Sequence, residues 1–411
     1  MKKILIVSSF LFTIIPSRIN SQNISVPSLK KHISYLASDI LKGRGTSTDE
    51  EKKAAEYLAS EFKRYGLKPE NKDSYLYEFK FKKNLDPHDT STSNVPERKG
   101  NDVVAFLDNK APYTIVIGAH YDHLGLGHDK NSRDPNPEGK IHNGADDNAS
   151  GTAGVLELAR YFSENKISEK LNFLFMCFSG EELGLIGSKK WCDAPTFPLE
   201  KISYMINMDM IGRLNDSTKK LIIYGVGTSP VWVPIIDSIK SSFSIKKDSA
   251  GIGPSDQTSF YLKDIPVLHF FTGQHEDYHK PSDDAEKINY DGEASVLEYI
   301  IRVINATPSS NKLKFLKTRN PDTGKSSFKV TMGVMPDYTF EGKGLRIDGV
   351  TDGKPAAIGG LKKGDVVIKL GDMDIKDIQV YMKALSEHKK GETVPVKVLR
   401  DGKEIELKVT F

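Results

Sequence analysis

The stretch HEDYH, residues 275–279, fits the pattern H-E-x-x-H. On a helix, this spacing places two imidazoles on one face, where both can bind zinc beside a catalytic glutamate. Here Gly273 precedes the stretch by two residues, Pro281 follows it by two, and apolar helical periodicity is absent. Because glycine and proline interrupt helices, the sequence predicts a loop, in which only His279 needs to bind a metal.

A second set of candidate ligands follows the apolar runs YTIVIGA, LNFLFMCF, ISYMINM and IPVLHFF. Such runs are typical of strands that are covered on both faces of a mostly parallel sheet. In the order of the chain, the side chains after these runs are His120, Glu181, Glu182, Asp209 and His279. Sites in open α/β sheets form beyond the carboxyl ends of the strands, so we expect these side chains to meet at one edge.

The Gly-rich turn HNGADDNASG adds Asp146 and Asp147 to this edge. Two imidazoles and several carboxylates suit zinc, and oxygen ligands make room for a metal pair. Two metals about 3.5–4 Å apart can share a carboxylate, polarise a carbonyl and hold a water nucleophile. A further carboxylate must take the proton from that water. The adjacent Glu181 and Glu182 can divide these tasks, because neighbouring side chains at a strand end point in different directions.

Other catalytic chemistries lack the required spacing. No G-x-S-x-G motif surrounds Ser179 or Ser255, and GVGTSP at 225–230 lacks the third glycine of a dinucleotide-binding loop. The two cysteines, Cys177 and Cys192, do not make a disulfide scaffold, and the apolar run FLFMCF predicts a buried free thiol at Cys177.

Five histidines, His32, His88, His128, His142 and His388, lie in polar, helical or loop stretches and are interpreted as surface residues or loop residues. His123 and His269 could serve a structural role.

The elements that must position the site indicate a three-layer α/β/α domain with a mostly parallel central sheet. A helix is predicted within residues 46–67, where Thr48 and Glu51 fit a capping box and Gly66 fits the C-terminal cap. A second helix is expected at 154–162. Residues 85–101 and 125–143 are predicted to be long loops.

The amino terminus resembles an export signal. Residues 1–22 contain a basic start, an apolar run too short to span a bilayer, and small residues near a cleavage point. We therefore expect an exported protein, periplasmic or secreted, without a stable membrane span. Loss of this segment removes three basic residues and no acidic one, which takes the formal net charge from +3 to zero. Such a balance argues against a nucleic-acid partner.

The motifs GAHYDH, GADDNASG, SGEELGLIGS, NMDMIG and YHKPSDD occur in this order. Together they resemble the secreted di-zinc aminopeptidases of metallopeptidase family twenty-eight, over about residues 28–305. The wider family includes glutamate carboxypeptidases, glutaminyl cyclases and the metal-free transferrin receptor.

The resemblance implies two Zn²⁺ ions per chain and a role for each matched residue. The implied ligands are His120 and Asp209 for one ion, Glu182 and His279 for the other, and Asp147 for both. Glu181 would be the general base, Asp122 would orient His120, and Tyr278 would stabilise the tetrahedral oxyanion. The chain departs from the family at Gln257, where relatives often have histidine, a difference that bears on the substrate pocket.

The carboxyl-terminal part of the chain changes character. Residues 309–327 are polar and basic and are predicted to be a linker, between a peptidase domain at 23–308 and a small α+β domain at 328–411. The stretch from Pro355 to Asp365 resembles PDZ domains of exported bacterial proteases. Such domains bind an extended peptide, often by its C-terminus, and Gly342, Gly344 and Leu345 are the candidate binding loop. The alternative is a domain that only packs on the peptidase and stabilises it.

These observations favour a zinc exopeptidase that releases N-terminal amino acids from peptides. A carboxypeptidase or a glutaminyl cyclase of the same family is one alternative, although a full two-metal ligand set favours hydrolysis over cyclisation. A non-catalytic protein that binds peptides through its PDZ-like domain is the other.

Overall fold

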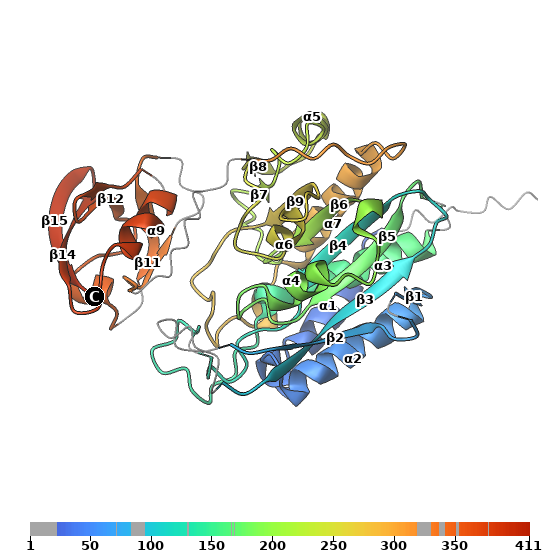
Figure 1. Ribbon diagram of the computed structural model, residues 1–411, viewed down its shortest axis with the longest axis horizontal. Helices are drawn as coiled ribbons and strands as arrows, with labels where there is room; N and C mark the ends of the chain where they lie inside the picture. Colours follow the sequence, from blue (N-terminus) through green and yellow to red (C-terminus); the bar gives the residue numbers. More distant parts are fainter. Residues whose placement is uncertain are drawn as a thin grey trace, which may run out of the picture.

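The computed structural model describes residues 23–70, 72–83, 95–129, 131–165, 167, 169–318, 330–336, 342–350, 353–376 and 378–411. The predicted export signal, residues 1–22, lies outside them. A nine-stranded sheet forms the larger unit, in the order β1-β3-β5-β4-β6-β9-β7-β8 with β2 beside β3 (Figure 1). Its strands are β1 (Lys68–Pro69), β2 (Leu76–Phe81), β3 (Arg98–Leu107), β4 (Thr114–His120), β5 (Asn172–Phe178), β6 (Ile202–Met208), β7 (Lys220–Tyr224), β8 (Ser244–Lys247) and β9 (Val267–Phe271).

The centre of this sheet is parallel, as the apolar runs predict. Strands β5, β4, β6 and β9 run parallel to one another. The flanks are partly antiparallel, because β3 pairs antiparallel with β5 and β7 with β9. Four neighbouring parallel strands therefore end at the same edge of the sheet.

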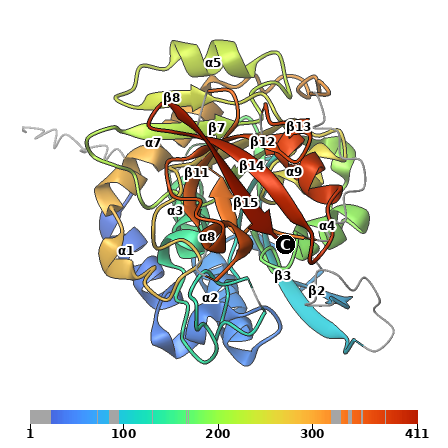
Figure 2. The ribbon, with the colours of Figure 1, turned by 90° about the vertical axis from the view of Figure 1, so that its left-hand side faces the viewer.

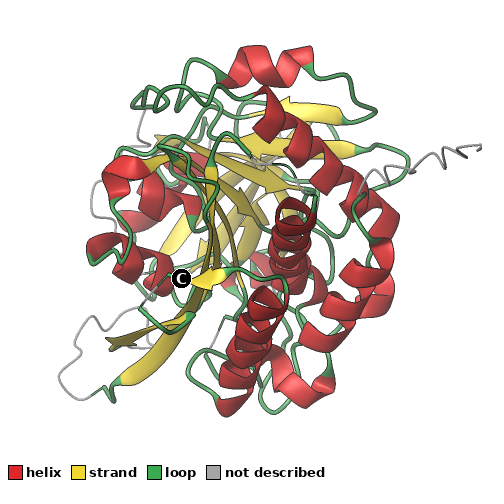
Figure 3. Ribbon diagram, turned by 90° about the vertical axis from the view of Figure 1, so that its right-hand side faces the viewer, coloured by secondary structure: helices red, strands yellow, loops and turns green. Residues whose placement is uncertain are grey.

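Helices cover both faces of the sheet (Figure 3). Along β4, Ile115 and Ile117 pack into one core while Val116 packs into the other, which explains why the whole strand is apolar. The first core includes residues of α1 (Val26–Leu36), α2 (Asp49–Arg64), α3 (Gly151–Glu164), α5 (Trp232–Ser238) and α7 (Tyr290–Ala306). The second includes residues of α4 (Ile186–Asp193) and α6 (Gln257–Tyr261). The three-layer prediction is confirmed.

Helix α2 begins and ends where its sequence signals indicate. The Thr48 hydroxyl oxygen accepts a hydrogen bond from the Glu51 amide at 3.1 Å, and Glu51 accepts one in return from the Ser47 amide at 2.6 Å. Gly66, with a φ of +77°, follows the last turn in the left-handed conformation that glycine favours. The buried face of α2 includes Leu58 and Phe62.

Two predicted boundaries need correction. Residues 98–101, predicted within a loop, form the start of β3, and they are polar because β3 pairs only with β2 there. The predicted linker 309–327 begins too early, because residues 309–318 pack on the peptidase domain. Leu313 is 7% exposed, and the amides of Leu316 and Thr318 donate to the Thr228 carbonyl and the Tyr261 hydroxyl.

The carboxyl-terminal unit is a six-stranded antiparallel sheet with two short helices; in Figure 2, β14 and β15 face the viewer. Its elements are β10 (Val334–Pro336), β11 (Leu345–Val350), α8 (Pro355–Ile358), β12 (Val366–Leu370), β13 (Met373–Asp374), α9 (Ile378–Ser386), β14 (Thr393–Arg400) and β15 (Lys403–Thr410). Asp401 and Gly402, both with positive φ, form the predicted tight turn between β14 and β15. Among the described residues of the chain, no helix has the length and apolar character needed to cross a membrane.

Candidate metal centre

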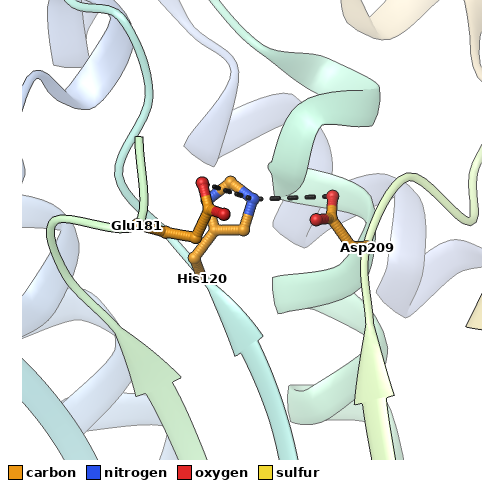
Figure 4. A group of neighbouring side chains, drawn as sticks. All are labelled: His120, Glu181 and Asp209. Atoms are coloured by element: carbon orange, nitrogen blue, oxygen red, sulfur yellow. Dashed lines mark ion pairs between the residues drawn. The ribbon is translucent and has the colours of Figure 1, made fainter. Parts of the chain in front are cut away.

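The predicted ligands meet at the carboxyl edge of the parallel strands. His120 is the last residue of β4, Glu181 and Glu182 follow β5, and Asp209 follows β6 directly. Figure 4 shows His120, Glu181 and Asp209 converging from three strands. The His120 Nε2 atom lies 3.5 Å from Asp209 Oδ1 and 3.9 Å from Glu181 Oε2. His120 and Asp209 form the first ligand group, and Glu181 lies beside this group.

Asp147 lies between this group and a second one. Its Oδ1 atom is 3.3 Å from His120 Nε2, and its Oδ2 atom is 3.1 Å from His279 Nε2. His279 Nε2 is in turn 3.2 Å from Glu182 Oε2. Each oxygen of the Asp147 carboxylate thus faces a different imidazole, which is the arrangement that a shared ligand of two metals requires.

Hydrogen bonds fix both imidazoles with Nε2 toward the centre. The Nδ1 atom of His120 is 3.1 Å from the Asp122 carbonyl oxygen, and that of His279 is 2.8 Å from the Asn131 carbonyl oxygen. A carbonyl acceptor holds the proton on Nδ1 and leaves the Nε2 lone pair free for a cation. Asn131 belongs to the long loop 125–143, so this loop helps to hold a ligand.

Asp122 acts on two neighbours. Its carboxylate is 3.7 Å from His120 Nδ1, which is farther than its own carbonyl oxygen. The same carboxylate accepts hydrogen bonds from the Glu181 amide at 3.1 Å and from the Thr46 hydroxyl at 2.7 Å. The predicted orientation of His120 therefore comes mainly from the Asp122 main chain, and the side chain fixes Glu181.

The turn that carries Asp147 is also held from behind. One carboxylate oxygen of Asp283 accepts hydrogen bonds from the amides of Asp146 and Asp147, at 2.9 and 3.0 Å. His275 Nε2 lies 3.1 Å from the Asp146 carboxylate. No helix forms around HEDYH, and Glu276 is exposed, so the loop prediction for this motif is confirmed.

The electrostatics of the site fit a cation. Burial opposes charge on His279, but the charge of Glu182 and the contact with Asp147 outweigh it and raise the pKa of His279 well above its usual range. Burial likewise opposes ionisation of Glu182, yet His279 holds the pKa of that carboxyl at about 2. A carboxylate field that favours protons on imidazoles also favours a divalent metal there, and the oxygen and nitrogen donors match zinc.

Glu181 differs from the other carboxylates. Burial raises the pKa of Glu181 well above its usual range, and the charge of Glu182 adds to this increase. A carboxyl group with a raised pKa beside the ligands is suited to accept a proton from a water molecule. The division of labour predicted for the two adjacent glutamates thus agrees with their positions.

A pocket that is partly open to solvent adjoins the centre. Among its lining residues are four with apolar surface, Met210, Tyr224, Phe271 and Tyr278. Tyr278 stacks on the ring of His279, with centroids 3.9 Å apart. A small apolar side chain can therefore lie within reach of the ligands.

Gln257 belongs to a buried polar network beneath Asp209. The Asn207 amide donates to Gln257 Oε1 at 3.2 Å and lies 3.2 Å from His269 Nδ1. Burial lowers the pKa of His269 to about 4, so this ring is neutral at pH 7. His269 also lines the pocket, in addition to the structural role considered for it.

The sequence reasoning missed one functional candidate, His123. Its Nδ1 atom lies 2.8 Å from Glu182 Oε1 and 3.8 Å from Asp147 Oδ2. The sequence feature that could have identified His123 is its position three residues after His120, beyond the end of the same strand.

The two cysteines, Cys177 and Cys192, are buried and free. In the small domain, the amide of Gly344 already donates to the Lys376 carbonyl at 3.0 Å, and Leu345 pairs with Val367. The assignment of Gly342, Gly344 and Leu345 to peptide binding stays a prediction.

Comparison with known proteins identifies the two units. Residues 102–304 match the model of peptidase family M28, and residues 321–411 match the PDZ domain model. Among curated proteins, leucine aminopeptidase 2 of Arthroderma otae is 27% identical over 186 residues, which are 42% of this chain and 36% of the relative. Aminopeptidase YwaD of Bacillus subtilis is 28% identical over 192 residues, 44% of this chain and 38% of the relative. The match thus spans little more than a third of these relatives' length.

Solved structures share the fold of the larger unit. A Zn-dependent exopeptidase from Parabacteroides distasonis has a TM-score of 0.55 at 17% identity, covering 69% of this chain and 98% of its own. The glutaminyl cyclase of Porphyromonas gingivalis has a TM-score of 0.54 at 16% identity, covering 69% and 99%. The ordered motifs, the sheet and the matched models agree: residues 102–304 are similar to peptidase family M28, and residues 321–411 are similar to PDZ domains.

Proposed function

We propose that this protein is a zinc-dependent aminopeptidase that removes N-terminal residues from peptides with two zinc ions. The observation that carries the proposal is Asp147, whose two carboxylate oxygens face two separate ligand groups while Glu181 lies beside the first. His120 and Asp209 would hold one ion with Asp147, and Glu182 and His279 the other. Zinc in such a site polarises a peptide carbonyl and makes water more acidic.

The residues of the chain supply the remaining steps. Glu181 takes a proton from the attacking water and delivers it to the amine that leaves, so one carboxyl group serves as base and then as acid. The apolar pocket of Met210, Tyr224 and Phe271 receives the side chain of the substrate's first residue. Tyr278, which lines the same pocket, donates a hydrogen bond from its hydroxyl to the oxygen that gains charge.

Two alternatives remain distinct from this proposal. Glutaminyl cyclases occur among the structural neighbours, but at 16% identity they share only the fold. A non-catalytic peptide-binding protein would not need Glu181 and five ligands gathered at one edge. Both alternatives predict a protein that does not hydrolyse amino-acyl substrates.

The discriminating experiment uses one panel of chromogenic and peptide substrates with zinc-loaded protein. We expect cleavage of leucyl-p-nitroanilide and of peptides with a blocked C-terminus, and no cleavage once the N-terminus is acetylated. Equal rates on acetylated and free peptides would exclude an aminopeptidase. Conversion of an N-terminal glutamine into pyroglutamate with release of ammonia, without peptide hydrolysis, would identify a cyclase instead.

We also propose that the protein is exported and that its PDZ domain binds an extended peptide or a protein C-terminus. The first proposal rests on the basic and apolar start of the chain, the second on the general use of this domain. Fractionation of cells that produce the full chain tests the first: we expect the protein in the periplasm or medium, with its first residues removed.

A further inference from the structure

The second ligand group contains an imidazole, His123, to which the family resemblance assigns no role. His123 is 1% exposed, and its Nδ1 atom faces the carboxylates of Glu182 and Asp147 at 2.8 and 3.8 Å. Among the described residues its other nitrogen, Nε2, is buried without a hydrogen-bond partner. The polar contacts of this ring are therefore directed at the second group alone.

The backbone holds the ring in this position. A Cβ atom on Gly144 would lie 2.4 Å from Cδ2 and 2.5 Å from Cγ of His123, so the ring occupies space that only a glycine leaves open. Gly144 also has a φ of +57°, which favours glycine. The His123 amide donates to the Arg44 carbonyl at 3.2 Å, which anchors the main chain at this residue.

The distances between the imidazole nitrogens and the carboxylate oxygens of the second group lie around the value expected for a zinc site. Metal bonds of about 2.0–2.1 Å in a tetrahedron separate neighbouring donors by roughly 3.3 Å. In the second group, His279 Nε2 is 3.1 Å from Asp147 and 3.2 Å from Glu182, and the two contacts of His123 lie on either side of 3.3 Å. His123, Asp147 and Glu182 alone already form a cluster able to hold a metal.

We propose that His123 is a fourth protein ligand of the second metal, through Nδ1. This inference rests on the proposed metal centre. The second metal then has four protein ligands, His123, Asp147, Glu182 and His279, whereas the first has three, His120, Asp147 and Asp209. Structural zinc sites have four protein ligands, and catalytic sites have three and keep a position for water. The second site therefore binds zinc more tightly than the first. The coordination position open to water lies at the first site, beside Glu181.

The alternative is that His123 only donates a hydrogen bond to Glu182 and so orients that ligand. Asparagine separates the two roles, because its amide can donate to a carboxylate but is a poor zinc ligand. His123→Asn should therefore behave like wild type if the hydrogen bond is the whole role, and like His123→Ala if the ring binds the metal.

The test is a zinc titration of metal-free protein in competition with a chelating dye. We expect two steps of unequal affinity in wild type. Both His123→Ala and His123→Asn should weaken the tighter step by more than about 100-fold, beyond the range of a residue that merely supports a ligand. Asp209→Asn should weaken the other step and leave the tighter one unchanged. His128→Ala, an exposed histidine of the adjoining loop, is the matched control and should change neither step.

A spectroscopic readout complements the affinities. With one equivalent of Co²⁺, the d–d absorption band should change in both His123 variants and remain as in wild type in Asp209→Asn and His128→Ala. A loss below about 100-fold in either His123 variant, or an unchanged cobalt band, would overturn the ligand assignment while leaving the metal pair intact. If wild type binds no zinc tightly, the metal centre itself is wrong, and the proposed function fails with it. Should the alanine variant not fold, the asparagine variant alone decides.

Discussion

Replacement of Glu181 by glutamine isolates proton transfer from metal binding. The Glu181 amide donates to the Asp122 carboxylate at 3.1 Å, a main-chain contact that the substitution retains. The side chain is 11% exposed, and its carboxylate lies 3.9 Å from the nearest ligand nitrogen, so an amide of the same size fits without displacing a ligand. Glutamine accepts no proton at neutral pH, and we therefore expect the chemical step alone to suffer.

The size of the effect follows from the usual contribution of a positioned base. Such a group accelerates proton transfer by about 10²–10⁴-fold, which corresponds to roughly 3–5.5 kcal/mol of the activation barrier. We expect kcat of Glu181→Gln on leucyl-p-nitroanilide to fall within this range at unchanged zinc content. Each preparation is assayed for zinc by atomic emission, so that rates are compared at equal occupancy.

Glu276→Gln is the matched control, because Glu276 is the glutamate of the H-E-x-x-H pattern and is exposed in the loop after β9. Its activity should remain within about twofold of wild type, as expected for an exposed side chain away from the ligands. The reasoning would be refuted by the reverse outcome, an inactive Glu276→Gln with an active Glu181→Gln. It would also fail if Glu181→Gln lost activity only in proportion to lost zinc.

Three further outcomes test the fold and the pocket. Phe271→Trp should narrow the apolar pocket and lower kcat/KM for leucyl substrates about tenfold relative to alanyl ones, and an unchanged ratio would place the substrate side chain elsewhere. A chain of residues 23–318 should fold and remain active without the PDZ domain. A chain of residues 23–308 should unfold at a lower urea concentration, because loss of buried Leu313 alone costs about 2 kcal/mol. Equal urea midpoints for the two truncated chains would contradict the packing of residues 309–318. Burial and the charge of Asp122 raise the pKa of Glu51 from 4.5 to about 8, so the folded state keeps a proton that the unfolded state releases. The protonated Glu51 carboxyl contributes its full stabilisation below pH 4.5, and this contribution is lost as the pH rises toward 8. The free energy of unfolding of Glu51→Gln, measured in urea, should therefore increase relative to that of wild type between pH 5 and pH 8. A difference that stays constant with pH would exclude this titration.

The sequence was sufficient to predict the site because its ligands follow uninterrupted apolar strands. Continuous burial of β4 and β5 makes them readable as central strands, and parallel neighbours necessarily end at one edge. The division between Asp147 as a shared ligand and Glu181 as a base came from the family resemblance, and the distances agree with it.

What sequence reasoning missed has physical causes. The ring of His123 lies beside the second group because Gly144 leaves room for it, and no periodicity in the sequence reveals this close approach. The start of β3 is polar since it pairs with a single neighbour, and polarity alone favoured a loop. Residues 309–318 resembled a linker because their few apolar residues alternate with lysines in a polar stretch, yet Leu313 packs into the core.

The central claim, a pair of metals that share Asp147, is tested most directly by the zinc content of the purified mature protein. Elemental analysis after zinc loading and removal of free metal should give two zinc ions per chain for wild type. Asp147→Asn should reduce this number below one, because the carboxylate serves both ligand groups. At most one tightly bound zinc in wild type, or two in Asp147→Asn, would contradict the account.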